Sequence, residues 1–159
     1  MLIAESGGNR VTPEPKIQAV CPLCRTPVRA KCGQINIWHF AHESLVECDL
    51  WAEPETDWHR KWKEKFKECY REIVVGNHRA DIKLESGLVV EFQNSPISPE
   101  TLQERERFYG KDSMLWVFNA TELPHGLKEN EFLKQEDQMR LRFLLTPLER
   151  GGRVSHERL

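Results

Sequence analysis

The sequence lacks the features that would assign the protein to a membrane or a secretory route. It contains no apolar run long enough to span a bilayer, and its first ten residues carry no hydrophobic stretch typical of a signal peptide. An excess of positive charge is also missing, since 23 Lys and Arg face 25 Asp and Glu, for a net charge of −2. We therefore expect a cytoplasmic protein in which any surface that binds nucleic acid is local.

Apolar residues are few, at 39% of the 159 residues, whereas charged residues make up 30%. The length suits one domain, or a modest domain with a small added module. A core built from so few apolar side chains is small, and a bound metal would help to stabilise it. The five cysteines cannot all pair, and in a reducing compartment closely spaced cysteines indicate metal binding before disulfides.

Cys21 and Cys24 form a CxxC knuckle, which is a common half of a zinc site. Structural zinc takes four Cys or His ligands, often two from each of two turns. A hairpin with strands over residues 28–31 and 34–38 is expected next, and Cys32 lies at its turn. The candidates for the second pair of ligands are Cys32, His39, His42 and Cys48.

Two ligand sets fit this spacing. In the first, His39 and His42 complete a Cys₂His₂ site. In the second, His42 and Cys48 complete the site, and His39 packs elsewhere. We favour the second set because the first leaves Cys48 without a role, and we treat Cys32 as a spare. Four protein ligands leave no position open for water, so the predicted Zn²⁺ is structural.

Residues 79–93 have the pattern of a β-hairpin. Apolar side chains alternate on both sides of a polar turn at residues 85–87, with Ala80, Ile82 and Leu84 before it and Leu88, Val90 and Phe92 after it. A three-residue turn pairs Leu84 with Leu88. A two-residue turn would shift the register by one residue and move facing side chains to opposite faces.

This register decides whether two acidic residues meet. With Leu84 opposite Leu88, Asp81 lies opposite Glu91, and facing Cβ atoms are about 5 Å apart. Gln93, two residues further on, shares their face. Two carboxylates this close repel each other unless a cation neutralises them, and hard oxygen ligands suit Mg²⁺. The pattern therefore predicts a divalent-metal site on the hairpin.

A helix is predicted over residues 54–70, with Pro54 at its first position and Glu55 in its first turn. A stripe expected to be buried recurs every four residues and then continues: Trp58, Trp62, Phe66, Cys69 and Tyr70. A second row beside it contains Glu55, His59 and Lys63. From the helix alone, this row is interpreted as a salt-bridged edge rather than as a row directed at the carboxylates.

Further elements follow in order. A strand over residues 72–75 and a turn at 76–77 precede the hairpin. Ser98 and Pro99 are typical of a helix start, and Gly110 is typical of its end. The remaining elements expected are a strand over residues 114–118, a helix over about 131–144 and a frayed polar end.

This order predicts an α/β fold with a small mixed β-sheet flanked by helices, arranged as αβββαβ. The strand–helix–strand crossover after the hairpin should join parallel strands. We divide the chain into a zinc-binding module at residues 1–50, a core at 51–125 and a C-terminal helical extension and tail at 126–159.

Several local motifs together resemble the competence protein CoiA-like family. In order, they are residues 21–24 (CPLC), 39–42 (HFAH) with Cys48, 53–59 (EPETDWH) followed by Trp62 and Lys63, 79–82 (RADI), 90–95 (VEFQNS) with Ile97 and Ser98, Arg105 with Tyr109, and 116–119 (WVFN). They span roughly residues 19–120, and their order and spacing make the set more specific than any single motif.

The core of this family resembles the PD-(D/E)XK restriction-endonuclease-like nucleases. The resemblance implies that Asp81 and Glu91 hold a divalent metal and that Glu55 completes or adjusts the site. One position departs from the pattern, because Gln93 stands where the usual residue is lysine. Glutamine can orient a water but supplies no positive charge to the transition state. His59 or Lys63 would then supply a proton or a charge.

The resemblance therefore implies a Mg²⁺- or Mn²⁺-dependent nuclease acting on DNA. The expected roles are metal ligand (Asp81, Glu91), water positioning (Gln93), support from the helix (Glu55, His59) and phosphate contact (Lys63, Arg79, Arg105). The alternative is a zinc-containing adaptor that binds nucleic acid on the same fold without turnover. The acidic net charge and Gln93 favour the adaptor, whereas the clustered acids oppose it.

Overall fold

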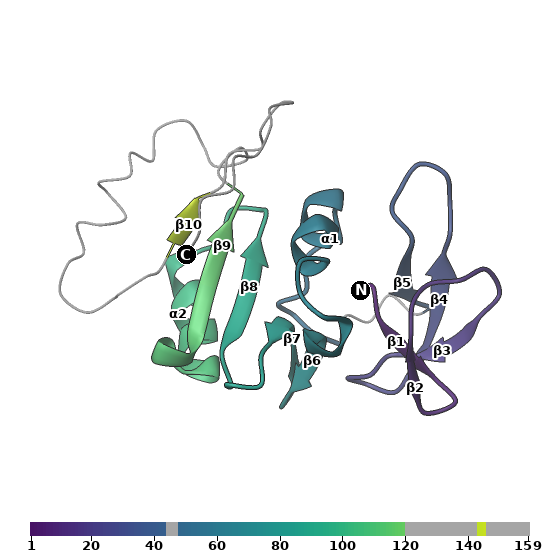
Figure 1. The fold of residues 1–159 in the computed structure, drawn as a ribbon, viewed down its shortest axis with the longest axis horizontal. Helices are drawn as coiled ribbons and strands as arrows, with labels where there is room; N and C mark the ends of the chain where they lie inside the picture. The colour runs from purple at the N-terminus through teal and green to yellow at the C-terminus, as the bar shows by residue number, and fades with distance from the viewer. Residues whose placement is uncertain (44–47, 120–142, 146–159) are drawn as a thin grey trace.

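The computed structural model describes residues 1–43, 48–119 and 143–145. Two five-stranded sheets lie side by side, one formed by the N-terminal residues and the other by the rest of the described chain (Figure 1). None of the helices in the described ranges is long and apolar enough to cross a membrane. The α/β class predicted from the sequence is confirmed.

The first sheet is antiparallel throughout, with strand order β2-β1-β3-β4-β5. Its strands are β1 (Ala4–Ser6), β2 (Asn9–Val11), β3 (Gln18–Val20), β4 (Pro27–Lys31) and β5 (His39–His42). Residues 1–16 therefore contribute two strands, β1 and β2. The strand predicted over 34–38 is wrong, because β5 begins only at His39 and the preceding residues form the connection from β4.

The second sheet is mixed, with strand order β10-β9-β8-β7-β6. Its strands are β6 (Arg71–Val75), β7 (His78–Lys83), β8 (Val89–Gln93), β9 (Met114–Phe118) and β10 (Phe143–Leu145). Strands β6 to β8 are antiparallel, and β8, β9 and β10 are parallel neighbours. The helix predicted over about 131–144 is wrong at Phe143 and Leu144, which pair with β9; its other residues lie outside the described ranges.

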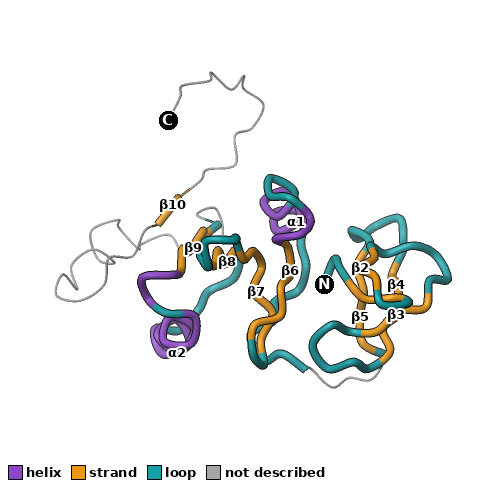
Figure 2. Tube along the Cα trace, turned by 60° about the horizontal axis from the view of Figure 1, so that its bottom comes forward, coloured by secondary structure: helices purple, strands orange, loops and turns teal. Residues whose placement is uncertain are grey.

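Helices α1 (Asp57–Lys63) and α2 (Pro99–Tyr109) cover opposite faces of this sheet (Figure 2). The order α1-β6-β7-β8-α2-β9 is the predicted αβββαβ core, with two short 3₁₀ turns, η1 (Glu68–Tyr70) and η2 (Lys111–Ser113). Apolar side chains fill both faces: Trp58, Ile82, Val90, Phe92 and Val117 under α1, and Leu102, Trp116 and Phe118 under α2. The alternation of Trp116, Val117 and Phe118 lets β9 pack against both helices.

The hairpin between β7 and β8 has the predicted register. Leu84 N–H donates to Leu88 O at 2.9 Å, and Ile82 pairs with Val90. One step outward, Asp81 and Glu91 face each other across the two strands. The three-residue turn was therefore the correct choice, and it brings the two acids together.

Helix α1 is much shorter than predicted. Thr56 caps its start, because its hydroxyl accepts from His59 N–H at 3.3 Å, so Pro54 and Glu55 precede the helix. At the other end, Arg71 donates to the carbonyl oxygens of Phe66 and Glu64, which a longer helix would have used within itself. The side chain of a later strand thus ends the helix early.

The predicted burial of the helix stripe is only partly correct. Trp58 is buried, while Trp62, Phe66 and Tyr70 are half-buried and Cys69 is exposed. Although the helix stops at Lys63, Phe66 and Tyr70 still pack against the core cluster that contains Trp58. Helix α2 has the predicted ends: Ser98 accepts from Thr101 N–H, Pro99 begins the helix, and Gly110 closes it at φ 88°.

Candidate active site and metal centre

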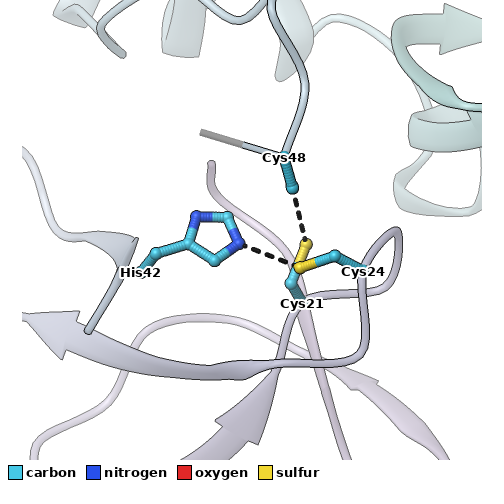
Figure 3. Close-up of side chains that lie close together, drawn as sticks. All are labelled: Cys21, Cys24, His42 and Cys48. Carbon is cyan, nitrogen blue, oxygen red and sulfur yellow. Dashed lines mark hydrogen bonds between the residues drawn. The ribbon is translucent and has the colours of Figure 1, made fainter. Parts of the chain in front are cut away.

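Four sulfur and nitrogen ligand atoms come together beside the first sheet. They belong to Cys21, Cys24, His42 and Cys48, and all lie within 4.8 Å of one another (Figure 3). Cys21 Sγ and Cys48 Sγ are 3.7 Å apart, and Cys24 Sγ and His42 Nε2 are 3.3 Å apart. A tetrahedral zinc with Zn–S bonds of about 2.3 Å separates its sulfurs by roughly 3.8 Å. The cluster can therefore hold a metal such as zinc.

The local chain explains how these ligands meet. The knuckle turns back after β3, with Cys21 N–H donating to Thr26 O and Arg25 N–H donating to Cys21 O. His42 ends β5, where it faces Val28 of the neighbouring strand. Cys48 approaches from the segment that leads into the second sheet (Figure 3).

The other candidate ligands lie elsewhere. His39 is at the far end of β5, opposite Lys31, and its Nδ1 is 2.8 Å from Ile37 O. Cys32 is likewise outside the cluster. Of the two ligand sets compatible with the sequence, the geometry favours the one with Cys48.

The thiols of the cluster differ in acidity. Burial raises the pKa of Cys24, but hydrogen bonds with Thr26 and then with His42 lower it by more than burial raises it. The resulting pKa is about 6. Burial and the neighbouring Cys21 raise the pKa of Cys48 to about 12. Thiols crowded at this distance resist joint ionisation, and a divalent cation removes that resistance.

Where β7 and β8 separate, the side chains of Asp81 and Glu91 take the place of backbone hydrogen bonds between the two strands. Asp81 N–H donates to Glu91 Oε1 at 3.2 Å, and Phe92 N–H donates to Asp81 Oδ2 at 2.9 Å. Each carboxylate thus accepts from the backbone of the opposite strand. The two side chains are fixed between the strands rather than extended into solvent.

Lys63, the last residue of α1, reaches the gap between β7 and β8 with its side chain. Its ammonium lies 2.9 Å from Asp81 Oδ1, 3.0 Å from Glu55 Oε2 and 3.0 Å from Glu72 Oε1. Lys63 is only 3% exposed, and His59 on the same helix is buried as well. The row was interpreted as a salt-bridged edge, and its Lys63–Glu55 salt bridge is present, but the row is buried and Lys63 is directed at Asp81.

Glu91 contacts a second cation, since Arg105 Nη1 of α2 is 3.4 Å from Glu91 Oε2. Burial raises the pKa of Glu91, the charge of Asp81 raises it further, and Arg105 only partly opposes them, so that the pKa is about 8. The guanidinium of Arg105 also donates to Trp51 O at 2.7 Å. In the absence of a bound metal, burial and Asp81 thus favour the protonated form of Glu91 against the attraction of Arg105.

Gln93 belongs to a polar group beside the acids. Its amide donates to Glu53 Oε1 and to Ser95 O. His59 Nε2 is 3.5 Å from Glu53 Oε2 and 3.1 Å from Phe92 O. Burial raises the pKa of Glu53, but the hydrogen bonds with His59 and Ser95 outweigh it, and the net pKa is lowered. Gln93 is therefore oriented by Glu53 and has no contact with Lys63.

The three cations expected to contact phosphate are enclosed by protein. Lys63 and Arg105 are buried, and the side chain of Arg79 is 11% exposed, with its Nε 3.8 Å from Glu72. All three contact carboxylates. Their charges therefore already have partners within the protein. Phosphate contact by these residues stays a prediction.

A cavity of about 30 Å³ lies between these side chains. A single water needs roughly 10–15 Å³, so one or two waters fit. Oε1 of Glu55, which lines the cavity, is buried without a hydrogen-bond partner among the described residues, and so is Oε1 of Gln93, which lies outside the lining. Buried oxygens without partners suit a hard cation or the waters around it, so the donor set fits Mg²⁺ or Mn²⁺.

The chain was compared with known families and proteins. Residues 56–143 match the family described as Competence protein CoiA, nuclease-like domain, and residues 16–50 match Competence protein CoiA, N-terminal domain. The chain belongs to the competence protein CoiA family. It is 26% identical over 118 residues to Competence protein CoiA of Bacillus subtilis (strain 168). The matched region covers 65% of this chain and 32% of that protein. No solved structure matches.

The resemblance to the CoiA-like family inferred from the local motifs is thus confirmed. The CoiA N-terminal match contains all four residues of the cysteine and histidine cluster. The CoiA nuclease-like match contains Asp81 and Glu91. The chain spans about a third of the length of the Bacillus relative. A nuclease-like domain indicates a role related to nucleases.

Sequence reasoning missed Glu72, Glu53 and Asp49. Glu72 is 1% exposed and contacts Lys63, whereas the pattern only placed it at the start of a strand. Glu53 lay within a quoted motif of the CoiA-like resemblance, but its contact with Gln93 depends on residues far away in sequence. Glu72 stands beside Arg71 at the start of its strand, so the local sequence gave no signal that it is buried.

Proposed function

We propose that the chain is a divalent-metal-dependent nuclease that hydrolyses phosphodiester bonds in DNA. The observation that supports it most directly is the pair of carboxylates, Asp81 and Glu91, held between diverging strands beside the buried ammonium of Lys63. The match to the CoiA nuclease-like domain supports the same conclusion.

The residues that would hold Mg²⁺ or Mn²⁺ are Asp81, Glu91 and Glu55. Glu55 would use its unpartnered oxygen, Oε1. The ion, when bound, would polarise the scissile phosphate and lower the pKa of the attacking water. Glu91 must lose its proton to become a ligand. Arg105, which contacts Glu91, favours that ionised form.

The remaining residues would orient the attack. Gln93 Oε1 has no partner among the described residues and is free to accept a hydrogen bond from water. Lys63 supplies the fixed positive charge that Gln93 lacks, at a position next to Asp81. His59 and Glu53 hold the Gln93 segment in place.

The rival function is a zinc-containing adaptor that binds nucleic acid without cleaving it. One observation favours it: Lys63 and Arg105 already contact Asp81 and Glu91, so a divalent ion has to compete with two internal cations. Titration calorimetry with Mn²⁺ separates the two functions. Binding near pH 7 should release close to one proton as Glu91 ionises, measured by repeating the titration in buffers of different ionisation enthalpy. The adaptor predicts neither binding beyond zinc nor proton release.

Cleavage is tested with circular single-stranded and double-stranded DNA in Mg²⁺, Mn²⁺ or EDTA, using excess protein and long incubation. Wild-type protein should cleave only with a divalent ion. Asp81→Asn and Glu91→Ala should abolish cleavage, because each removes a proposed metal ligand, and should leave DNA binding intact. Glu85→Gln is the matched control, since Glu85 is an exposed acid at the tip of the same hairpin. Equal activity in Glu91→Ala and wild type would contradict the nuclease.

We further propose that Cys21, Cys24, His42 and Cys48 bind a structural Zn²⁺ and that residues 1–50 form the zinc module. The nuclease core would begin at residue 51. Because β10 pairs with β9, the core sheet extends beyond the boundary at residue 125 that the sequence indicated.

A further inference from the structure

Phe108 is an exposed aromatic residue at the border of the candidate active site. It lies in the last turn of α2 and is 40% exposed, although phenylalanine is among the residues most often buried. Two of the rings that contact it, Trp51 and Tyr109, also line the cavity beside Asp81 and Glu91. Phe108 is therefore separated from that cavity by a single layer of aromatic side chains.

The contacts of Phe108 with two stacked rings fix its orientation. Trp51 and His78 lie with their centroids 3.3 Å apart and their planes 6° apart. The Phe108 centroid is 5.3 Å from that of Trp51 and 4.8 Å from that of His78, and its plane is nearly perpendicular to both. Two such similar distances place Phe108 beside the stack rather than at one end of it. At this separation, one face of the Phe108 ring covers the edges of both neighbours.

The opposite face of the Phe108 ring is the exposed one. Tyr109 is 5.0 Å from Phe108 and only 6.0 Å from Trp51, so it lies on the same side of Phe108 as Trp51 does. Gly76 contacts the rim of the ring, since a Cβ atom built on Gly76 would be 3.1 Å from Phe108 Cζ. Neighbours thus hold the ring by one face and its rim, and its other face is open.

Two cations flank Phe108 in the sequence, Arg107 and Lys111, and both are exposed. Neither forms a salt bridge with another described residue. An open aromatic face next to such cations suits a nucleotide, because its base stacks on the ring while its phosphate attracts a positive charge. A base can stack on a protein side chain in this way only when it is not stacked within a duplex.

We propose that the exposed face of Phe108 stacks an unpaired base of DNA and thereby selects single-stranded DNA for the adjacent site. This inference rests on the proposed nuclease function and adds a substrate class to it. Phe108 would contact the substrate away from the reacting phosphate. Its loss should therefore weaken DNA binding and leave the chemical step unchanged.

The binding test uses the full chain as purified, with no added divalent ion, so that DNA is not cleaved. Fluorescence anisotropy compares a labelled oligothymidylate with an abasic oligonucleotide of the same length and charge. Wild-type protein should bind the oligothymidylate about 5-fold or more tightly than the abasic strand, which is the lower end of the contribution of one stacked base. Phe108→Ala should lose this preference and keep the wild-type affinity for the abasic strand.

A second variant separates base stacking from a purely structural role of the ring. Phe108→Leu keeps an apolar side chain over Trp51 and His78 but has no aromatic face. We expect it to keep a Tm near that of wild type and to lose the preference for bases; Phe108→Met serves if Phe108→Leu fails to fold. Ile35→Ala, which removes a 96% exposed apolar side chain elsewhere, should match wild type. A wild-type preference in Phe108→Leu would overturn the stacking role and leave Phe108 as a cover for Trp51 and His78.

Cleavage is not needed for a decision. A base preference that depends on Phe108 supports the stacking role even if the protein proves inactive, and then only the nuclease proposal fails. Equal wild-type affinity for the two strands, tighter binding of duplex than of single-stranded DNA, or no binding of either strand overturns the stacking role, whether or not the protein cleaves DNA. In an active protein, Phe108→Ala should raise KM for single-stranded circles with kcat close to wild type.

Discussion

Burial controls the charge of Glu91. Its pKa of about 8 in the folded protein is above the ordinary 4.5, because burial and the neighbouring Asp81 disfavour the ionised form. Between these two values the folded state binds a proton that the unfolded state has released. Its contribution to stability is therefore fully present below pH 4.5 and is lost as pH rises through 8.

Replacing Glu91 with glutamine should remove this pH dependence. In metal-free protein, the Tm of Glu91→Gln should be close to wild type near pH 5, where Glu91 is protonated. It should exceed wild type near pH 9, where the native carboxylate is buried and charged. Thermal unfolding followed by circular dichroism at both pH values measures the difference, with Glu85→Gln as a control that should show none. A constant Tm difference between the two pH values would contradict the raised pKa.

Zinc binding by the proposed cysteine and histidine cluster can be tested one residue at a time. Cys24→Ser should lose most of the zinc bound per chain and a large part of the thermal stability, because the ligand set is no longer complete. Cys32→Ser is the matched control and should retain zinc, since Cys32 lies outside the cluster. Metal analysis of protein purified without added zinc measures both. Loss of zinc in His39→Ala but not in Cys48→Ala would favour the Cys₂His₂ set instead.

Among the secondary-structure elements, those fixed by local chemistry were predictable. The turn over residues 85–87 set the register of β7 and β8, and Ser98 and Gly110 bounded α2. Helix α1 was not predictable in the same way, because Arg71, from the following strand, donates to the carbonyl oxygens of Glu64 and Phe66 just beyond its last residue. Sequence periodicity carries no information about that tertiary contact.

The candidate site shows the same division. Asp81 and Glu91 follow from strand register, which a sequence can reveal. Glu72 and Asp49 acquire their partners through contacts between residues distant in sequence. No local pattern distinguishes such an acid from one at the surface, so only the fold identifies them.

The N-cap of α1 contributes to both helix and site. Thr56 Oγ1 accepts from His59 N–H and lies 2.9 Å from His59 Nδ1, so it fixes the helix start and the imidazole together. Thr56→Ala should lower the free energy of unfolding by about 1 kcal/mol. Ser98→Ala, at the N-cap of α2, should cost a similar amount without touching the site.

Denaturant unfolding measures the two costs, and DNA cleavage distinguishes the two caps. Under the proposed function, only Thr56→Ala should reduce cleavage, because His59 then loses the contact that orients its Nδ1. Equal loss of cleavage in both variants would assign the effect to stability alone.

In the whole molecule, Asp49 connects the metal centre to the nuclease-like sheet. It directly follows Cys48, is 3% exposed, and accepts from Arg79 N–H at 2.9 Å through Oδ2. Its Oδ1 lies 2.8 Å from His78 Nδ1, and the His78 ring stacks on Trp51. Cys48 and the start of β7 are thus joined through a single buried carboxylate.

Under the proposed zinc site, chelation should therefore affect β7. It would free Cys48, loosen Asp49 and weaken the hydrogen bond between Asp49 and the Arg79 amide. Hydrogen exchange at Arg79 N–H should become faster, while exchange at Leu102 N–H, which donates to Ser98 O within α2, should change little. Equal acceleration at both amides would indicate global unfolding, and no change at Arg79 would show that the two sheets are independent.

The contacts of Glu72 also govern the order in which the chain can assemble during synthesis. Leu2 and Glu72 are 70 residues apart, so the amide of Leu2 gains this acceptor only once the strand bearing Glu72 has been produced. At about 5–20 residues per second, that delay is roughly 4–14 s. Over this interval the amides of Leu2 and Ile3 are without that partner, and their final placement coincides with the arrival of Glu72 beside Lys63.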